Sequence, residues 1–267
     1  MLDKSKKGQV TLFVILGLII LLAIILVVSF KSDTVEKIKS VQIFKPSLIE
    51  IEAENVKAEA EGCMTDVLEG GLFLIGLQGG YISVDGMEYT NITYELLLPY
   101  WPGMEGTVYS YYGNTNRIPS VQMAAEGLSS YLDEHVPRLC KTEKEGVDYG
   151  NFKSEVLITD VEVVVNADWD VTVRKENAEA KIEKMTIKVP VRLKVLLTLF
   201  RQMVDDQIEA SKEKLCVSCW SRVASYNNLE IRTQELGKDT IFLIFDSKSK
   251  IAGGDYPFML ALMLNKE

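Results

Sequence analysis

The N-terminus is basic and leads directly into an apolar run from Val10 to Phe30, which single Thr, Gly and Ser residues interrupt. A helix rises about 1.5 Å per residue, so this run would extend roughly 31 Å, the thickness of the hydrocarbon core of a bilayer. Basic flanks tend to stay in the cytoplasm. We therefore expect residues 1–9 in the cytoplasm, a transmembrane helix over 10–30, and the rest of the chain outside.

Three interpretations of this segment are open. A cleaved secretory signal has a shorter apolar core and small residues at its exit, whereas this core is too long and Val27-Val28-Ser29-Phe30 fits such an exit poorly. A permanent signal anchor fits both the length and the charge. In the third interpretation a peptidase cuts on the cytoplasmic side, and the apolar helix stays on the product.

The residues Lys7, Gly8 and Gln9, followed at once by a Val/Leu/Ile-rich helix, resemble the class III signal of archaeal pilin-like proteins. This resemblance implies cleavage between Gly8 and Gln9. Such signals commonly carry Glu at the fifth mature position to guide filament assembly, and this chain has Phe13 there. The departure weakens the filament inference more than the cleavage inference.

The wider chain is similar to uncharacterised membrane-anchored surface proteins of archaea. The features that carry this similarity are the start Lys7–Phe13, Cys63, and the stretch Gly76–Tyr81. The similarity extends over most of the chain and implies an extracytoplasmic location, but no established activity.

The chain carries 38 acidic and 29 basic residues, a net charge of −9, and three of its lysines precede the apolar run. The part beyond that run is therefore more acidic still. An acidic surface repels nucleic acid and anionic lipid headgroups, so we expect neither as a partner. The expected partners are the bilayer, through residues 10–30, and other surface or filament proteins.

Beyond a polar stem over 31–45, we expect one extracytoplasmic α+β domain over 46–267, with a mostly antiparallel sheet and helices packed on it. Periodicity of three to four predicts helices, and alternation predicts strands. The predicted helices span about 46–79, 119–139 and 195–208, and residues 80–118 are expected to be loop-rich. The predicted strands are 155–165, a returning strand through Val171 and Val173, 185–191, 227–234, 240–246 and 257–264, with a turn at Asn166-Ala167-Asp168.

Four cysteines follow the apolar run, and an even number in an extracytoplasmic domain favours disulfides. Three pairings are possible. We favour Cys63–Cys140 with Cys216–Cys219, because the first would join two predicted helices across a long loop. Closing such a loop contributes about 3–5 kcal/mol in the chain-entropy picture.

The motif Cys216-Val217-Ser218-Cys219-Trp220 also raises the possibility of redox chemistry. In thiol-disulfide oxidoreductases a CxxC opens a helix, whose dipole lowers the pKa of the first thiol. Here the motif follows a predicted helix rather than a strand, and the Trp comes after it. We favour a structural disulfide. A zinc site is disfavoured, because one CxxC supplies only two ligands.

The remaining chemistry-bearing residues indicate no catalytic site. The one histidine, His135, lies near a predicted helix C-terminus, where it helps to satisfy carbonyl groups. Asp168 and Asp170 flank Trp169 at a predicted hairpin turn, and turn geometry accounts for them, with a surface Ca²⁺ site as the alternative. Asp205 and Asp206 are adjacent on a helix and point in different directions. We expect no metal and no cofactor.

Aromatic residues in the loop-rich stretch are candidates for a binding surface, since such rings stack on sugars, peptides or a membrane interface. The alternative, which we favour, is that they cover the core. The candidates are Tyr100, Trp101, Tyr109, Tyr111 and Tyr112. Asn91 begins an Asn-Ile-Thr glycosylation sequon nearby. The glycines at 76, 79 and 80 follow a helix rather than a strand, so they predict a helix stop and not a phosphate loop.

The leading functional hypothesis is a non-enzymatic, membrane-anchored surface protein that acts in adhesion, recognition or envelope assembly. One alternative is a pilin-like filament subunit cleaved after Gly8. A second, from another class, is a membrane-tethered thiol-disulfide oxidoreductase that uses Cys216 and Cys219. An exposed Cys216 would favour the enzyme, and a buried disulfide would exclude it.

Overall fold

The computed structural model describes residues 47–90, 106–210 and 215–263. Several predictions fall outside these residues: the cytoplasmic segment 1–9 with Lys7, Gly8 and Gln9, the span 10–30, and the stem 31–45. No helix within the described part of the chain is both long enough and apolar enough to cross a bilayer. The described residues from Leu48 onward form one compact unit.

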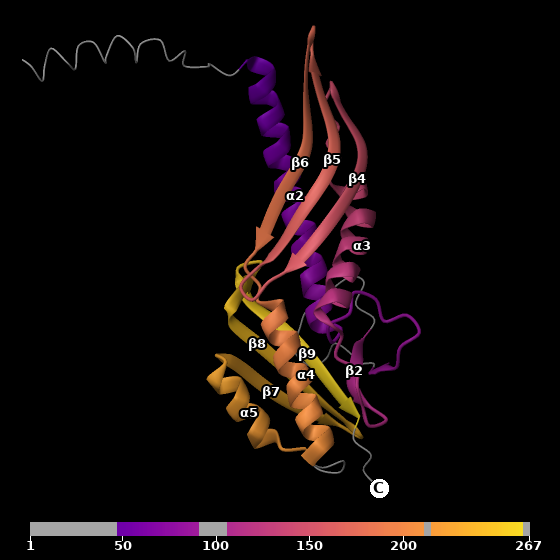
Figure 1. Ribbon diagram of the computed structural model, residues 1–267, viewed down its shortest axis with the longest axis vertical. Coiled ribbons are helices and arrows are strands. Elements are labelled where there is room, and N and C mark those ends of the chain that lie inside the picture. The colour runs from indigo at the N-terminus through magenta and orange to yellow at the C-terminus, as the bar shows by residue number, and fades with distance from the viewer. Residues whose placement is uncertain (1–46, 91–105, 211–214, 264–267) are drawn as a thin grey trace, which may run out of the picture. The chain divides into compact units, whose positions relative to one another are not determined.

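This unit is α+β, and its sheets are mostly antiparallel (Figure 1). Its helices are α2 (Leu48–Leu77), α3 (Val121–Leu139), α4 (Leu193–Ala210) and α5 (Val217–Tyr226). Its strands are β1 (Tyr89–Thr90), β2 (Thr107–Tyr112), β3 (Thr115–Asn116), β4 (Val147–Ile158), β5 (Val163–Lys175), β6 (Ala178–Val189), β7 (Leu229–Leu236), β8 (Asp239–Ile251) and β9 (Gly254–Met263).

The strands form two sheets rather than one. The smaller is three-stranded, in the order β4-β5-β6, and is antiparallel throughout. The larger has the order β1-β2-β9-β8-β7, with β3 paired to β2. Its β2–β9 pair is parallel. Residues 107–112, which we expected to be loop, therefore form an internal strand. The sequence did not indicate this strand, because its pairing partner β9 lies some 150 residues later and leaves no local signal.

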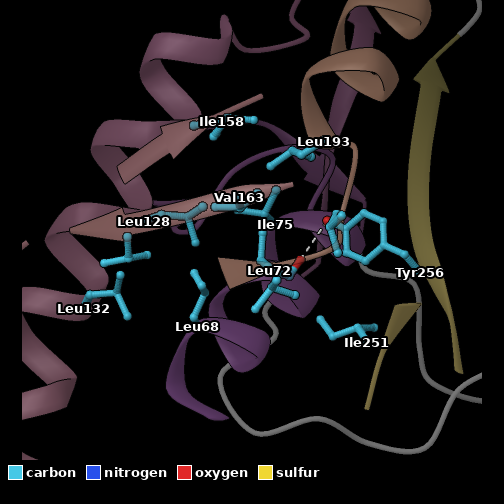
Figure 2. Packing of buried hydrophobic residues seen from close by; sticks show 14 of the residues in the cluster. Leu68, Leu72, Ile75, Leu128, Leu132, Ile158, Val163, Leu193, Ile251 and Tyr256 are labelled. Carbon is cyan, nitrogen blue, oxygen red and sulfur yellow. Dashed lines mark hydrogen bonds between the residues drawn. The ribbon is translucent and has the colours of Figure 1, made fainter. Parts of the chain in front are cut away.

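Helix α2 packs against β6 of the small sheet, against β9 of the large sheet, and against α3. Its first half buries a narrow stripe at helical spacing, with Ala53, Val56 and Ala60 facing the core. Small residues on this stripe allow close approach of the sheet. From Leu68 onward nearly every residue is at least half-buried, and Figure 2 shows this end of the helix surrounded by side chains of α3, both sheets and α4.

The C-terminal end of α2 is built by glycines. Gly79 has φ of +77°, a left-handed conformation that glycine adopts without strain, and the amide of Gly80 donates to the carbonyl of Ile75 at 2.7 Å. Gly76 sits directly on β9, where an added Cβ would lie 2.2 Å from the carbonyl oxygen of Pro257. The Tyr256 hydroxyl donates to the carbonyl of Leu72 at 2.8 Å (Figure 2).

The predicted turn at Asn166-Ala167-Asp168 is wrong. These residues lie within β5, and the chain reverses at Thr159–Glu162 instead. The Thr159 hydroxyl accepts from the amide of Glu162 at 3.0 Å and donates to its carbonyl at 2.7 Å, which closes the turn locally. Asn166 and Asp168 are polar because they face solvent on alternate positions of the strand.

A buried ion pair joins the end of β6 to β8. The Arg192 guanidinium donates to both oxygens of Asp246, at 2.6 Å each, and to the carbonyl of Asn227 at 2.6 Å. Their side chains are only 12% and 1% exposed. The Ser249 hydroxyl and the amide of Lys248 supply two further donors to the carboxylate. Every oxygen of Asp246 is thus satisfied, as a buried charge requires.

The contact between α2 and β9 predicts opposite effects for two glycine substitutions in one helix. Gly76→Ala should lower the free energy of unfolding by about 1–3 kcal/mol, because the new methyl group overpacks against Pro257. Gly62→Ala, where nothing lies within 4 Å of the added Cβ, should raise it by about 0.5–1 kcal/mol. Urea unfolding followed by the fluorescence of the buried Trp169 and Trp220 measures both. A Gly76→Ala protein as stable as Gly62→Ala would contradict the packing.

Candidate functional sites

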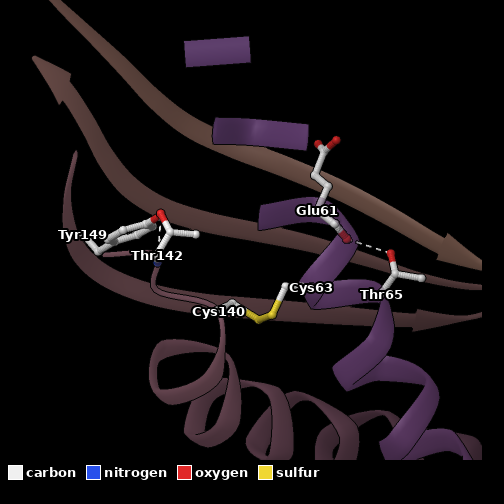
Figure 3. Close-up of a disulfide and its surroundings, with 6 residues drawn as sticks. All are labelled: Glu61, Cys63, Thr65, Cys140, Thr142 and Tyr149. Atoms are coloured by element: carbon white, nitrogen blue, oxygen red, sulfur yellow. Dashed lines mark hydrogen bonds between the residues drawn. A yellow bond between two sulfur atoms is a disulfide. The ribbon is translucent and has the colours of Figure 1, made fainter. Parts of the chain in front are cut away.

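A disulfide connects α2 to α3. It joins Cys63, in the middle of α2, to Cys140, which caps the C-terminus of α3, with 5.6 Å between the Cα atoms (Figure 3). Cys140 is buried. The second disulfide joins Cys216 to Cys219, so the pairing is the one that we favoured among the three. No cysteine of the chain is left as a free thiol.

The Cys216–Cys219 disulfide lies at the N-terminus of a helix. Cys216 is the N-cap residue of α5, and its carbonyl accepts from the amides of Cys219 and Trp220 at 3.0 and 3.1 Å. Both cysteines are exposed. Trp220 is buried and stacks on Phe242 of β8, with 4.6 Å between the ring centroids. The tryptophan therefore anchors this turn to the sheet and leaves the disulfide facing solvent.

We did not predict α5, and this changes the interpretation of the motif. The CxxC follows α4, as expected, but it also opens a new helix, which is the position that redox-active pairs occupy. A sequence signal for α5 existed. Trp220, Val223 and Ala224 recur at steps of three and one, which is the spacing of one helical face.

Two of the aromatic surface candidates belong to the core. Tyr109 and Tyr111 lie in β2 and are 8% and 2% exposed, so they offer no binding surface. Their hydroxyl groups donate to Asp239 at 2.8 Å and to Asn114 at 2.7 Å. Burial, with the adjacent Asp239 carboxylate, raises the pKa of Tyr109 to about 12. Our expectation of irregular backbone here is wrong because β2 pairs with β9.

Tyr112, at the end of β2, is half-buried and faces Arg117, whose guanidinium carbon lies 4.5 Å from the centre of its ring. The remaining candidates of this group, Tyr100, Trp101 and the sequon residue Asn91, lie outside the described residues.

His135 has a structural environment. Its Nδ1 lies 2.9 Å from the carbonyl oxygen of Tyr131, one turn earlier in α3, and its ring stacks on that tyrosine. Asp168 and Asp170 are exposed within β5 rather than at a turn. Across the described ranges, no group of three or more His, Cys, Asp or Glu side chains is arranged to hold a metal ion.

Sequence reasoning missed a pocket of about 430 Å³ that two arginines line. We call it the arginine pocket. It lies between the segment before β1, the start of α3, and α4, and its polar lining consists of Tyr81, Glu88, Asn116, Arg117 and Arg201. Arg117 and Arg201 stand 84 positions apart in the sequence, and no local motif connects them. Only the packing of α4 near β3 brings them to one site.

Hydrogen bonds to the backbone hold this site together. The Tyr81 hydroxyl donates to the carbonyl of Arg117 at 2.7 Å. The Arg201 guanidinium donates to the carbonyl of Ile118, and the Arg117 guanidinium pairs with Glu88. The pKa of Tyr81 is raised by burial, while the positive charges of Arg201 and Arg117 act in the opposite direction. Both arginine charges therefore act at the tyrosine hydroxyl.

Comparison with known proteins gives no relative: no family model matches the chain, and no significant match is found among curated proteins or solved structures. The function of this protein must therefore be inferred from its own residues.

The exposure of the two disulfides predicts the order in which they are reduced. Thiol-disulfide exchange requires access of the attacking thiolate to a sulfur atom. Dithiothreitol should therefore reduce Cys216–Cys219 before Cys63–Cys140, with one sulfur of the latter buried in the α2–α3 contact. Differential alkylation followed by peptide mass analysis at increasing times measures both. Simultaneous loss, or loss of Cys63–Cys140 first, would contradict the structure.

Proposed function

We propose that this protein is a membrane-anchored cell-surface protein, whose head works outside the cytoplasm in recognition, adhesion or envelope assembly and does not catalyse a reaction. The observation that supports this most directly is the pairing of all four cysteines as disulfides. Disulfides persist in oxidising compartments and are rare in the cytosol. The apolar run over residues 10–30 precedes these cysteines in the sequence, and three lysines precede the run.

The two disulfides support this topology with different strength. Cys63–Cys140 spans 77 positions and staples the two helices that cover the small sheet. In a reducing compartment, the head would lose the roughly 3–5 kcal/mol that closing such a loop contributes. A short exposed CxxC disulfide contributes less, since the loop that it closes is small. The case therefore rests on Cys63–Cys140.

The proposal predicts that the exposed disulfide is accessible on intact cells. A membrane-impermeant phosphine followed by a membrane-impermeant maleimide should label Cys216 and Cys219 without lysis. The Cys216→Ser/Cys219→Ser variant should lose this labelling, and a cytoplasmic thiol protein in the same cells serves as the control. Labelling that requires lysis would place the head in the cytoplasm and overturn the proposal.

Intact mass of the protein from the same membranes separates two forms of the proposal. A chain that begins at Gln9 would support pilin-type processing and, with polymers visible by electron microscopy, the filament subunit. A full-length chain would support a single-copy anchor.

A second candidate function is thiol-disulfide oxidoreduction by Cys216 and Cys219. The exposure of both sulfur-bearing residues at the N-terminus of α5 favours it. In that reaction the Cys216 thiolate would attack a disulfide of the substrate, form a mixed disulfide and release one substrate thiol. The Cys219 thiolate would then displace the second substrate thiol, which leaves the substrate reduced and the CxxC oxidised. A dithiol donor would have to reduce it again.

This second function predicts a depressed thiol pKa at Cys216, because the partial positive charge of a helix N-terminus stabilises a thiolate. In a Cys219→Ser protein, the rate of iodoacetamide alkylation of Cys216 against pH should reach half its plateau below about pH 7.5. Cys216→Ser provides the background. An inflection near pH 8.5, the ordinary value for cysteine, would exclude the redox function and leave a structural disulfide.

A further inference from the structure

The arginine pocket is a local positive site in a chain whose net charge is −9. The ionisable side chains of its lining, apart from the neutral Tyr81, are Arg117, Arg201 and Glu88. Glu88 forms an ion pair with Arg117. The lining therefore keeps one positive charge in excess, and that charge is carried by Arg201.

Arg201 is held in place from its backbone and from its side chain. The Asn116 amide donates to the carbonyl of Arg201 at 2.8 Å and to the carboxylate of Asp205 at 2.7 Å. One nitrogen of the Arg201 guanidinium donates to the carbonyl of Ile118. Within the described parts of the chain, Arg201 forms no ion pair. Its remaining guanidinium donors are thus oriented without a carboxylate partner.

Arg117 forms the second wall of the pocket. Its guanidinium lies over the Tyr112 ring and forms an ion pair with Glu88. Its carbonyl accepts a hydrogen bond from the Tyr81 hydroxyl, which holds the tyrosine ring against the same wall. An arginine stacked on an aromatic ring and paired with a carboxylate has little rotational freedom left. The site is therefore organised before a ligand arrives.

The rest of the lining is largely apolar. Met87 and the exposed Met123 line the pocket together with the buried Val108 and Ile118. Methionine side chains are unbranched and adapt to apolar groups of different shape. A volume of about 430 Å³ falls within the range of pockets that hold small ligands. The pocket therefore offers one anion contact beside an adaptable apolar surface.

We infer that the arginine pocket binds a carboxylate that carries an apolar group, with the carboxylate on the guanidinium of Arg201 and the apolar group against Met87 and Met123. Arginine presents donors in a planar fork that matches a carboxylate. The single excess charge of the lining fits a monoanion better than a dianionic phosphate, which would also face the Glu88 carboxylate.

Two sources of this chemistry are a free carboxylic acid and the C-terminal carboxylate of a peptide or protein chain. The inference deepens the proposed recognition role, and rests on it only for the compartment in which the ligand is met. Binding in vitro and location in the cell are measured separately, so the failure of one does not imply the failure of the other.

The first test compares two probes of similar shape, of which one ends in a charged carboxylate and the other in a neutral amide. N-acetyl-leucine and N-acetyl-leucine amide are titrated into the full-length chain in detergent micelles, and binding is followed by calorimetry. The carboxylate should bind about ten- to hundred-fold more tightly than the amide, as a hydrogen bond to a charged group implies, and its binding should weaken as salt is raised. Equal affinity for the amide, or no binding of the acid, would overturn the inference.

The second test removes the charge from the pocket. Arg201→Gln should weaken binding of the acid about ten- to hundred-fold and leave the weak binding of the amide unchanged. The matched control is Arg222→Gln, at an exposed arginine on α5 outside the pocket lining, which should bind like the parent protein. An equal loss in both variants would overturn the assignment to Arg201. If Arg201→Gln does not fold, the comparison of the two probes on the parent protein still decides.

The third test separates the two sources of carboxylate. A pentapeptide that ends in a free leucine is compared with the same peptide amidated at its C-terminus, and both are compared with N-acetyl-leucine. Tighter binding of the free peptide than of N-acetyl-leucine supports a protein C-terminus as the ligand, and the reverse order supports a small acid. A free peptide and a small acid that both fail to bind would overturn the inference.

Discussion

The close contact of helix α2 with strand β9 is the constraint on which the rest of the structure depends. One face of α2 covers the three-stranded sheet, and its C-terminal end lies against the larger sheet. At Gly76 the helix backbone approaches the strand so closely that no side chain would fit. Among the described strands, none of one sheet is hydrogen-bonded to a strand of the other, so this helix supplies much of the apolar contact between the sheets.

Two other interactions secure this arrangement in different ways. The Cys63–Cys140 disulfide keeps α3 beside α2, and so acts mainly by limiting the unfolded chain. The Arg192–Asp246 pair links the end of β6 to β8, but the desolvation of two charges offsets much of its attraction. Its donors and acceptors are matched in one geometry, so it contributes more to the specificity of the junction than to its net stability.

The two candidate functional sites, the Cys216–Cys219 disulfide and the arginine pocket, both lie at the surface and rest on core residues. Trp220 packs on Phe242 and holds the Cys216–Cys219 turn at the surface. The arginine pocket is organised by backbone carbonyls of the β3–α3 connection, which accept from Tyr81 and Arg201. In both cases buried contacts fix the backbone, and the polar groups that remain face solvent.

Much of the fold followed from local patterns. The helices α2, α3 and α4 and the three C-terminal strands were predicted at their places in the chain, because each has a clear period, although β8 runs five residues beyond its predicted end. The favoured cysteine pairing is confirmed, and the reason for favouring it was that Cys63–Cys140 would join two helices that the periodicity predicts. The turn at Thr159 was missed because Asn166 and Asp168 carry stronger turn chemistry, although they only face solvent on a strand.

By itself the sequence determined the α+β class and the long α2 helix with its glycine stop, which depend on residues near one another. It favoured the cysteine pairing that the structure shows, but left the other two pairings open. Only the tertiary structure decided that residues 107–112 form an internal strand, that the CxxC opens a helix, and that Arg117 and Arg201 share a pocket. A parallel strand pair and a two-arginine site join residues far apart in the chain. Local periodicity carries no information about such contacts, because they are set by which surfaces pack together.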